Sequence, residues 1–293
     1  MSNICYVKSL SANLWTESFG NLSDPLIILI SGAEKQGIYW SDSWCNTLAN
    51  SGYLVVRFDN RDTGLSQHIN FNHSPYYLHD MANDVLCIIK FYKKEKAHLI
   101  GSGMGGYLAQ MIAINNPEKV SSLALLMTTY NAMDIEEIRI NEYETFHKSS
   151  PGIFVKLERV SRMLVDDPKW LSKAISHLKL LNGPYAPFNE KEAEAFAYLL
   201  KKRINENNAP SFIHNHLLAK NQSNLFFKSN FITHNTLVIH GSDDPIISIQ
   251  HAHTTAKIIP NSTLKIISKM GHLLTSFFEK EISDSVINHF KKI

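Results

Sequence analysis

The chain has 293 residues, of which 44% are hydrophobic and 19% are charged, and its formal net charge is +2 with histidine neutral. This length fits one large domain or two small ones, and the composition is typical of a globular protein with a sizeable core. The small net charge argues against strong attraction to nucleic acid or to an anionic membrane, and no apolar run reaches membrane-spanning length. We therefore expect neither nucleic acid nor a membrane as a partner.

The N-terminal stretch MSNICYVKSLSANLW lacks a charged segment followed by an apolar one, so we expect no signal peptide. The three cysteines, Cys5, Cys45 and Cys87, form neither an obvious pair nor a set with metal-ligand spacing. This usage is typical of reduced thiols, and it predicts a cytoplasmic protein without a bound metal.

Short apolar runs bounded by turn residues recur along the chain and predict strands. Their continuous apolar character is typical of strands that are buried on both faces, as in a parallel sheet. The runs are Leu26–Ile30, Tyr53–Phe58, His98–Ile100, Leu123–Met127, Leu237–His240 and Leu264–Ile267.

Segments with helical spacing of apolar residues lie between these runs. They include the stretch from Trp40 to Leu48, a stripe from Met81 to Tyr92, the segment YLAQMIAI after Gly106, and the last helix at Glu279–Phe290. Strands that alternate with helices predict an α/β fold with a doubly wound, mostly parallel sheet.

The alternation stops between residues 131 and 235. This stretch has a mostly helical pattern, with expected helices at Ile153–Leu164, Trp170–Leu180, Glu190–Ile204 and Pro210–Ala219. An insertion of this size between two strands would lie over the carboxyl ends of the sheet, where α/β proteins bind ligands. We predict a core made of residues 1–130 and 236–293, and a helical cap made of residues 131–235.

A glycine-rich turn joins the run His98–Ile100 to the helix that follows it. The turn matches the Gly-x-Ser-x-Gly frame of a nucleophile elbow with Gly101 and Gly105 as the flanking glycines. The nucleophile position is then Gly103, which has no side chain. Ser102 precedes it and belongs to the end of the strand, so its side chain is expected to point away from the base.

An acid and a histidine follow the last two strand-like runs. The run Leu237–His240 leads into Gly241-Ser242-Asp243-Asp244-Pro245, and the run Leu264–Ile267 leads to His272. This order matches the acid and the histidine of a Ser-Asp-His triad, in which the histidine is general base and acid and the carboxylate orients it. We predict Asp244 as the acid because it directly precedes the proline, with Asp243 as the alternative.

Two backbone N–H groups are candidates for an oxyanion hole. One comes from the loop after the first core strand and the other from the residue after the nucleophile, which makes Ala33 and Met104 the expected donors. The run RFDNRDTGLS, which begins at Arg57, predicts a tight loop pinned by side-chain hydrogen bonds, with a structural role.

Other ligand classes have weaker support. Gly101-x-Gly103-x-x-Gly106 matches a dinucleotide-binding turn, but such a turn follows the first strand of its fold and needs an acid on the next strand. The pairs His214/His216 and His251/His253 have a spacing that does not bring two side chains together on a helix. We expect no cofactor and no metal.

Several motifs in order resemble those of the α/β-hydrolase superfamily, and within it those of the aclacinomycin methylesterase group of polyketide-tailoring esterases. They are RFDNRDTGLS with Pro75-Tyr76 downstream, IGSGMGGYLAQMIA, Pro187-Phe188-Asn189-Glu190, the acidic turn at Asp243-Asp244 and Met270-Gly271-His272. The resemblance implies a sheet of about eight strands, a cap over the site, and hydrolysis of a carboxylic ester without a cofactor. It also implies a serine at the position of Gly103.

Three functions are compatible with glycine at position 103. The chain is a serine esterase for a small to medium apolar ester that carries a Ser→Gly change, by engineering or naturally. Alternatively, His272 and Asp244 with the oxyanion donors carry out a lyase or cyclase step on a carbonyl compound, which needs no nucleophile. In the third, the chain is an inactive ligand-binding protein. The sequence leaves the oligomeric state open.

Overall fold

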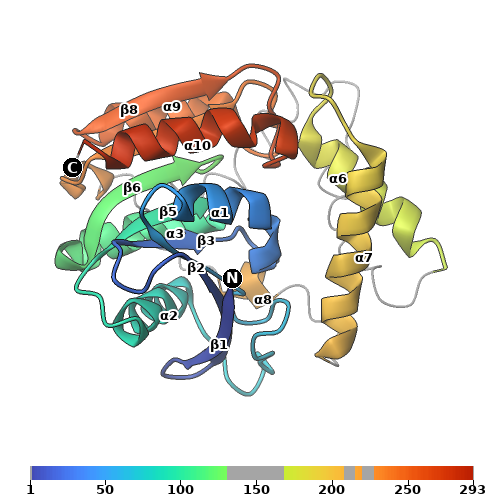
Figure 1. Cartoon of the computed structure of the whole chain (residues 1–293), viewed down its shortest axis with the longest axis horizontal. Coiled ribbons are helices and arrows are strands. Elements are labelled where there is room, and N and C mark those ends of the chain that lie inside the picture. The colour runs from blue at the N-terminus through green and yellow to red at the C-terminus, as the bar shows by residue number, and fades with distance from the viewer. Residues whose placement is uncertain (1, 131–167, 208–214, 220–227, 293) are drawn as a thin grey trace.

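The computed structural model describes residues 2–130, 168–207, 215–219 and 228–292 (Figure 1). The expected helix at Ile153–Leu164 lies outside these residues, as does the first half of the one expected at Pro210–Ala219. All structural statements below concern the described residues.

The core is an eight-stranded sheet with the order β1-β2-β4-β3-β5-β6-β7-β8. The first two strands pair antiparallel, and β2 pairs antiparallel with β4, whereas all the other neighbours are parallel. The strands are β1 (Asn3–Lys8), β2 (Asn13–Phe19), β3 (Leu26–Ile30), β4 (Leu54–Phe58), β5 (Ala97–Ser102), β6 (Val120–Leu126), β7 (Thr236–Gly241) and β8 (Ser262–Ile267).

Helices cover both faces of this sheet. The described helices are α1 (Asp42–Ala49), α2 (Leu78–Phe91), α3 (Met104–Asn115), α6 (Trp170–Asn182), α7 (Glu190–Glu206), α8 (Asn215–Leu218), α9 (Ile249–Ile258) and α10 (Ser276–Phe290), with 3₁₀ turns η1 (Gly37–Tyr39), η2 (Pro117–Lys119) and η3 (Ser229–Phe231). Helices α2, α3 and α9 share one apolar cluster, and α1 and α10 share another.

Strand β3 shows why continuous apolar runs form the centre of the sheet. Leu26, Ile28 and Ile30 belong to the first cluster, whereas Ile27 and Leu29 belong to the second. Successive side chains of a strand point to opposite faces, so a strand between two helical layers must be apolar at every position. The predicted mostly parallel, doubly wound sheet of about eight strands is confirmed.

The prediction from apolar runs did not name β1 and β2. Strand β1 is largely exposed, and β2 contains buried polar residues, among them Thr16 and Glu17. Glu17 is tolerated because its carboxylate accepts hydrogen bonds from Arg57, at 2.6 and 3.0 Å. A strand whose polar side chains are satisfied by a neighbour has no apolar signature in the sequence.

Helices α6 and α7 pack against each other between β6 and β7 in the chain. They lie at the end of the sheet toward which the arrowheads of β6 and β8 point, which is the carboxyl end of the parallel strands (Figure 1). The helices expected at Trp170–Leu180 and Glu190–Ile204 correspond to α6 and α7, each of which extends two residues further. In the part of the chain that the structure describes, no helix is both long and apolar enough to cross a membrane.

Candidate active site

The turn between β5 and α3 is sharp because three glycines build it. Gly103 has φ 54° and ψ −121°, a combination that strains any residue with a side chain. A Cβ on Gly101 would overlap the Gly105 carbonyl, and one on Gly105 would overlap the carbonyl oxygen of Ile30. The turn therefore lets helix α3 start directly above the carboxyl end of strand β5.

The space beside Gly103 faces His272. A Cβ built on Gly103 would lie 3.6 Å from His272 Nε2 and 3.7 Å from Gly32 Cα, both ordinary van der Waals contacts. Position 103 can therefore hold a side chain in contact with the imidazole without displacing its neighbours. Ser102 is the last residue of β5 and lies in register with Leu126, and no described hydrogen bond joins it to His272.

The predicted acid and histidine meet at the carboxyl end of the sheet. His272 Nδ1 lies 2.8 Å from Asp244 Oδ2, and the other oxygen of Asp244 accepts hydrogen bonds from the backbone N–H groups of Ile246 and Ile247 at 2.8 and 2.9 Å. His240 Nε2 lies 3.4 Å from Asp244 Oδ2. The side chain of Asp243 instead accepts a hydrogen bond from Ser242. Asp244, and not Asp243, therefore orients the imidazole in this structure.

Burial and neighbouring charges fix the protonation of this pair. Burial lowers the pKa of His272 and the nearby Lys35 lowers it further, which outweighs the opposite effect of Asp244. Burial by itself would raise the pKa of Asp244, but His272 and the hydrogen bonds to the carboxylate bring it below its usual value. At neutral pH, Asp244 is therefore ionised and His272 is neutral. Its Nδ1–H donates to Asp244, and the Nε2 lone pair faces Gly103.

The loop after β3 places Ala33 and its neighbours beside this space. Lys35 N–H donates to the Gly32 carbonyl at 3.2 Å and closes a turn, in which Glu34 has φ 61°. Met104 is the first residue of α3, so its N–H has no partner within the helix. Gly32 borders the space beside Gly103, and Met104 follows Gly103 directly at the start of α3, so the N–H groups of Ala33 and Met104 remain the predicted oxyanion donors.

A histidine from the segment between β6 and β7 holds this loop. His216 Nδ1 accepts a hydrogen bond from Glu34 N–H at 2.9 Å, while Nε2 donates to the Arg61 carbonyl at 2.7 Å. Both contacts require the neutral ring, and burial keeps it neutral by lowering its pKa. The sequence pattern, in which His216 was half of a His-x-His pair, carried no sign of this role.

Two further side chains near His272 were missed in the sequence. Lys35 Nζ donates to the His272 carbonyl at 3.3 Å, and burial lowers its pKa to about 8 against the opposing effect of Asp244. Burial lowers the pKa of His177, on α6, to about 4, and Lys35 and His272 add to this effect. The sequence does contain a signal for Lys35, because it is a cationic residue two positions after the predicted oxyanion donor Ala33. It contains no local signal for His177.

The loop that begins at Arg57 is pinned as its sequence predicts. Asp59 is fully buried and accepts hydrogen bonds from the N–H groups of Gly37 and Leu65 and from Arg203 of α7, at 2.6, 2.7 and 2.5 Å. Arg61 forms a two-pronged pair with Asp84 of α2. The loop therefore joins the core to the segment between β6 and β7.

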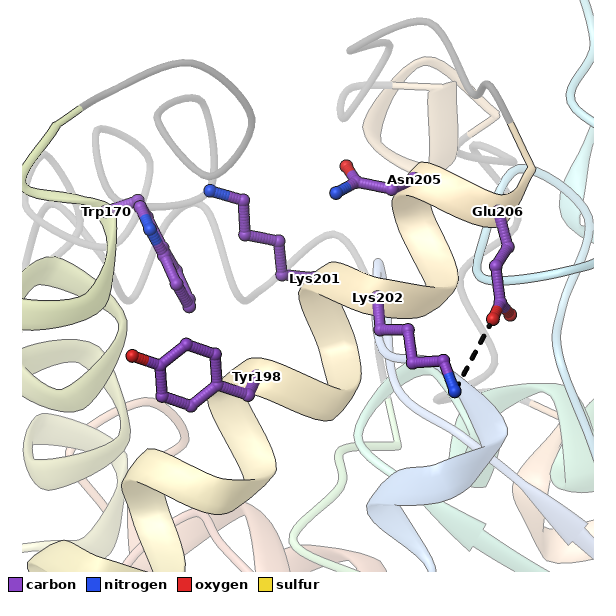
Figure 2. Close-up of a pocket in the computed structure, with 6 residues that line it drawn as sticks. All are labelled: Trp170, Tyr198, Lys201, Lys202, Asn205 and Glu206. Atoms are coloured by element: carbon purple, nitrogen blue, oxygen red, sulfur yellow. Dashed lines mark ion pairs between the residues drawn. The ribbon is translucent and has the colours of Figure 1, made fainter.

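A groove of ≈ 600 Å³ is lined by side chains of α7 and by Trp170 at the start of α6 (Figure 2). Trp170 and Tyr198 meet edge to face in it, and Lys201 Nζ lies 4.1 Å from the centre of the Trp170 ring. None of the predicted site residues lines this groove. The described residues also contain no cluster of three or more His, Cys, Asp or Glu side chains arranged to hold a metal ion.

Curated proteins and solved structures resemble this chain over most of its length. The chain is 26% identical over 286 residues to the rhodomycin D methylesterases DauP of Streptomyces sp. (strain C5) and DnrP of Streptomyces peucetius, and each alignment covers 94% of both chains. Its fold is similar to that of 2-hydroxy-6-oxo-6-phenylhexa-2,4-dienoate hydrolase from Rhodococcus sp. strain RHA1, with a TM-score of 0.76, 16% identity, and coverage of 99% of this chain and 100% of that one. The model of the alpha/beta hydrolase fold family matches residues 25–278. The chain therefore belongs to the α/β-hydrolase fold family.

Proposed function

We propose that this chain is built as a carboxylic ester hydrolase, similar to methylesterases, in which Gly103 occupies the position of the nucleophile. The observation that carries the proposal is the distance of 3.6 Å between His272 Nε2 and the point where a Cβ on Gly103 would lie. A serine hydroxyl at this point would come within hydrogen-bonding reach of the imidazole. The proposed substrate is a small to medium apolar ester.

The proposed mechanism assigns one role to each group. With serine at position 103, neutral His272 takes the hydroxyl proton as the oxygen attacks the ester carbonyl, and it later returns the proton to the leaving alcohol. Asp244 keeps the Nδ1–H tautomer and stabilises the imidazolium. The N–H groups of Ala33 and Met104 stabilise the negative oxygen of the tetrahedral intermediate. Water then attacks the acyl-enzyme with His272 as the base, which needs neither metal nor cofactor.

With glycine at position 103, only part of this machinery remains. His272 and the two N–H donors can still polarise a carbonyl and activate water. The residual acceleration of such sites is roughly 10³–10⁴-fold over the uncatalysed reaction, well below that of an intact triad. We therefore expect slow ester hydrolysis, or none above background, from the chain with Gly103.

The test compares hydrolysis of short p-nitrophenyl esters by the chain with Gly103, by Gly103→Ser, and by both carrying His272→Ala. We expect serine to raise turnover by several orders of magnitude, and the gain to disappear with His272→Ala. A folded Gly103→Ser protein without esterase activity would count against the proposal.

That result would favour the alternative, a lyase or cyclase step on a carbonyl compound. The specific observation in its favour is a neutral, Asp244-oriented imidazole whose Nε2 faces a position without a side chain. Such a base can remove a proton next to a carbonyl while the N–H donors stabilise the enolate. If this step is also absent while ligands still bind, the chain is a binding protein.

A further inference from the structure

Lys35 lies next to the proposed catalytic groups. The turn from Gly32 to Lys35 folds the lysine back, so that its Cδ lies 3.6 Å from the point where a Cβ on Gly32 would be. Gly32 Cα itself lies 3.7 Å from the corresponding point on Gly103. Since the lysine stem is long and flexible, its ammonium group can reach the space beside Gly103.

The charge of Lys35 is not neutralised by an ion pair among the described residues. Nζ donates to the His272 carbonyl and lies 5.4 Å from the centre of the Tyr39 ring, but no carboxylate lies within 4.0 Å of it. Asp244 is the nearest charge of opposite sign that acts on it. The oxygens of Asp244, however, are already bound to His272 and to two backbone N–H groups. A partly buried ammonium without a counter-ion is costly, and an anion that binds there removes the cost.

The other groups around this space also favour negative charge. The N-terminus of α3 carries the positive end of the helix dipole, and the N–H groups of Ala33 and Met104 are donors. The imidazole of His177 is buried, and its Nδ1 has no hydrogen-bond partner among the described residues. The N–H donors and the Lys35 ammonium therefore border a space that the His272 Nε2 lone pair also faces. Among the described residues, Asp244, which is bound to His272, is the carboxylate that acts on Lys35, and Glu34 carries a further carboxylate next to it in the chain.

We propose that the ligand of this site carries an ionised carboxylate, and that Lys35 is the residue that binds it. This inference uses the location of the proposed esterase site, but it concerns binding and does not depend on ester hydrolysis. It narrows the ligand class to a free carboxylic acid, or to an ester with a second, ionised carboxyl group.

The test is calorimetric titration of the unsubstituted chain with benzoate and butyrate, and with their uncharged counterparts benzamide and butyramide, at constant ionic strength. We expect the carboxylates to bind and the amides to bind at least about 10-fold more weakly, since a charge-assisted pair contributes more than a neutral hydrogen bond. Lys35→Met should lose this preference, and Lys35→Arg should keep it. Lys201→Met, which removes a cation from the groove along α7 (Figure 2), should behave like the unsubstituted chain.

The dependence on pH gives a second readout. Because the pKa of Lys35 is lowered to about 8, carboxylate affinity should fall as pH rises from 7 to 9. With Lys35→Arg it should stay nearly constant over this range, because arginine keeps its charge. Asp244, whose pKa is lowered, and His177, whose pKa is lowered to about 4, also act on Lys35 or His272, and neither changes its charge between pH 7 and 9.

Three results would overturn the proposal: equal affinity for benzoate and benzamide, unchanged carboxylate preference in Lys35→Met, or no binding of either carboxylate. The esterase proposal is tested independently, because it depends on turnover by Gly103→Ser. An inert Gly103→Ser protein whose parent still binds benzoate through Lys35 would leave the inference on Lys35 intact.

Discussion

The backbone of Gly103 lies where a residue with a side chain is strained, but a Cβ there meets only van der Waals contacts. We expect Gly103→Ala to lower the free energy of unfolding by about 1–3 kcal/mol, because strain is the only cost. Gly105→Ala should cost clearly more, since its Cβ would overlap the carbonyl oxygen of Ile30. Urea unfolding of both variants checks this, and equal losses would contradict it.

The two neighbouring aspartates of the acidic turn differ in their partners. Asp244 contacts His272, whereas Asp243 accepts a hydrogen bond from Ser242. In a Gly103→Ser background, we expect Asp244→Asn to lower kcat by ~10⁴-fold, because the amide supports the wrong imidazole tautomer. Asp243→Asn is the matched control and should leave kcat nearly unchanged. The opposite pattern in p-nitrophenyl ester kinetics would reassign the acid.

Among the elements, α7 is attached to the core by a buried ion pair. Arg203 Nη2 lies 2.5 Å from Asp59 Oδ2, and Nε donates to Gln36 at 2.8 Å. Burial raises the pKa of Asp59, and Arg203 counteracts this effect. Removal of the arginine therefore leaves a buried carboxylate with two backbone donors but no counter-charge.

We expect Arg203→Met to lower the free energy of unfolding by about 3–5 kcal/mol. Lys202→Met is the matched control, because Lys202 precedes Arg203 in the same helix and pairs with Glu206 at 3.7 Å on the exposed face (Figure 2). It should change stability by about 1 kcal/mol or less. Thermal and urea unfolding measure both changes. Similar losses in the two variants would show that the buried pair does not hold α7 to the core.

At the scale of the whole molecule, buried histidines link stability to pH. Burial lowers the pKa of His98 and of His177 to about 4, while an unfolded chain binds protons at about 6.5. Above pH 6.5 both states are neutral. As pH falls from about 6.5 to about 4, the unfolded chain takes up protons that the folded one does not, so stability is lost with decreasing pH.

We expect the free energy of unfolding to fall by up to about 1.4 kcal/mol per pH unit for each such histidine in this range. His98→Gln should lower, by about one proton, the number of protons taken up on unfolding in this range. The free energy of unfolding measured in urea should then depend less steeply on pH. His73 is exposed, so His73→Gln should leave the slope unchanged. A slope that is the same in all three proteins would contradict the assignment of His98 as a buried, neutral group.

Local patterns predicted the parts of the fold that depend on burial alone. Strand β3 matches its predicted run residue for residue, because a central strand between two helical layers is apolar throughout. The same argument did not predict strands β1 and β2. They pair with each other, and polar side chains of β2 are satisfied by partners, as Glu17 is by Arg57. The start of α10 was placed three residues late, although buried Phe278 continues the stripe of Ile282, Val286 and Phe290 at the same four-residue spacing.

The sequence by itself determined the sheet, and it also placed Gly103, Asp244 and His272 at one edge of it. The physical reason is that parallel strands end at a common edge, so residues that follow successive strands gather there. The tertiary structure alone decided the roles of Lys35 and His216 and the attachment of α7 through Arg203. Those contacts join segments far apart in the chain, and they arise from packing, which leaves no periodic signal in the sequence.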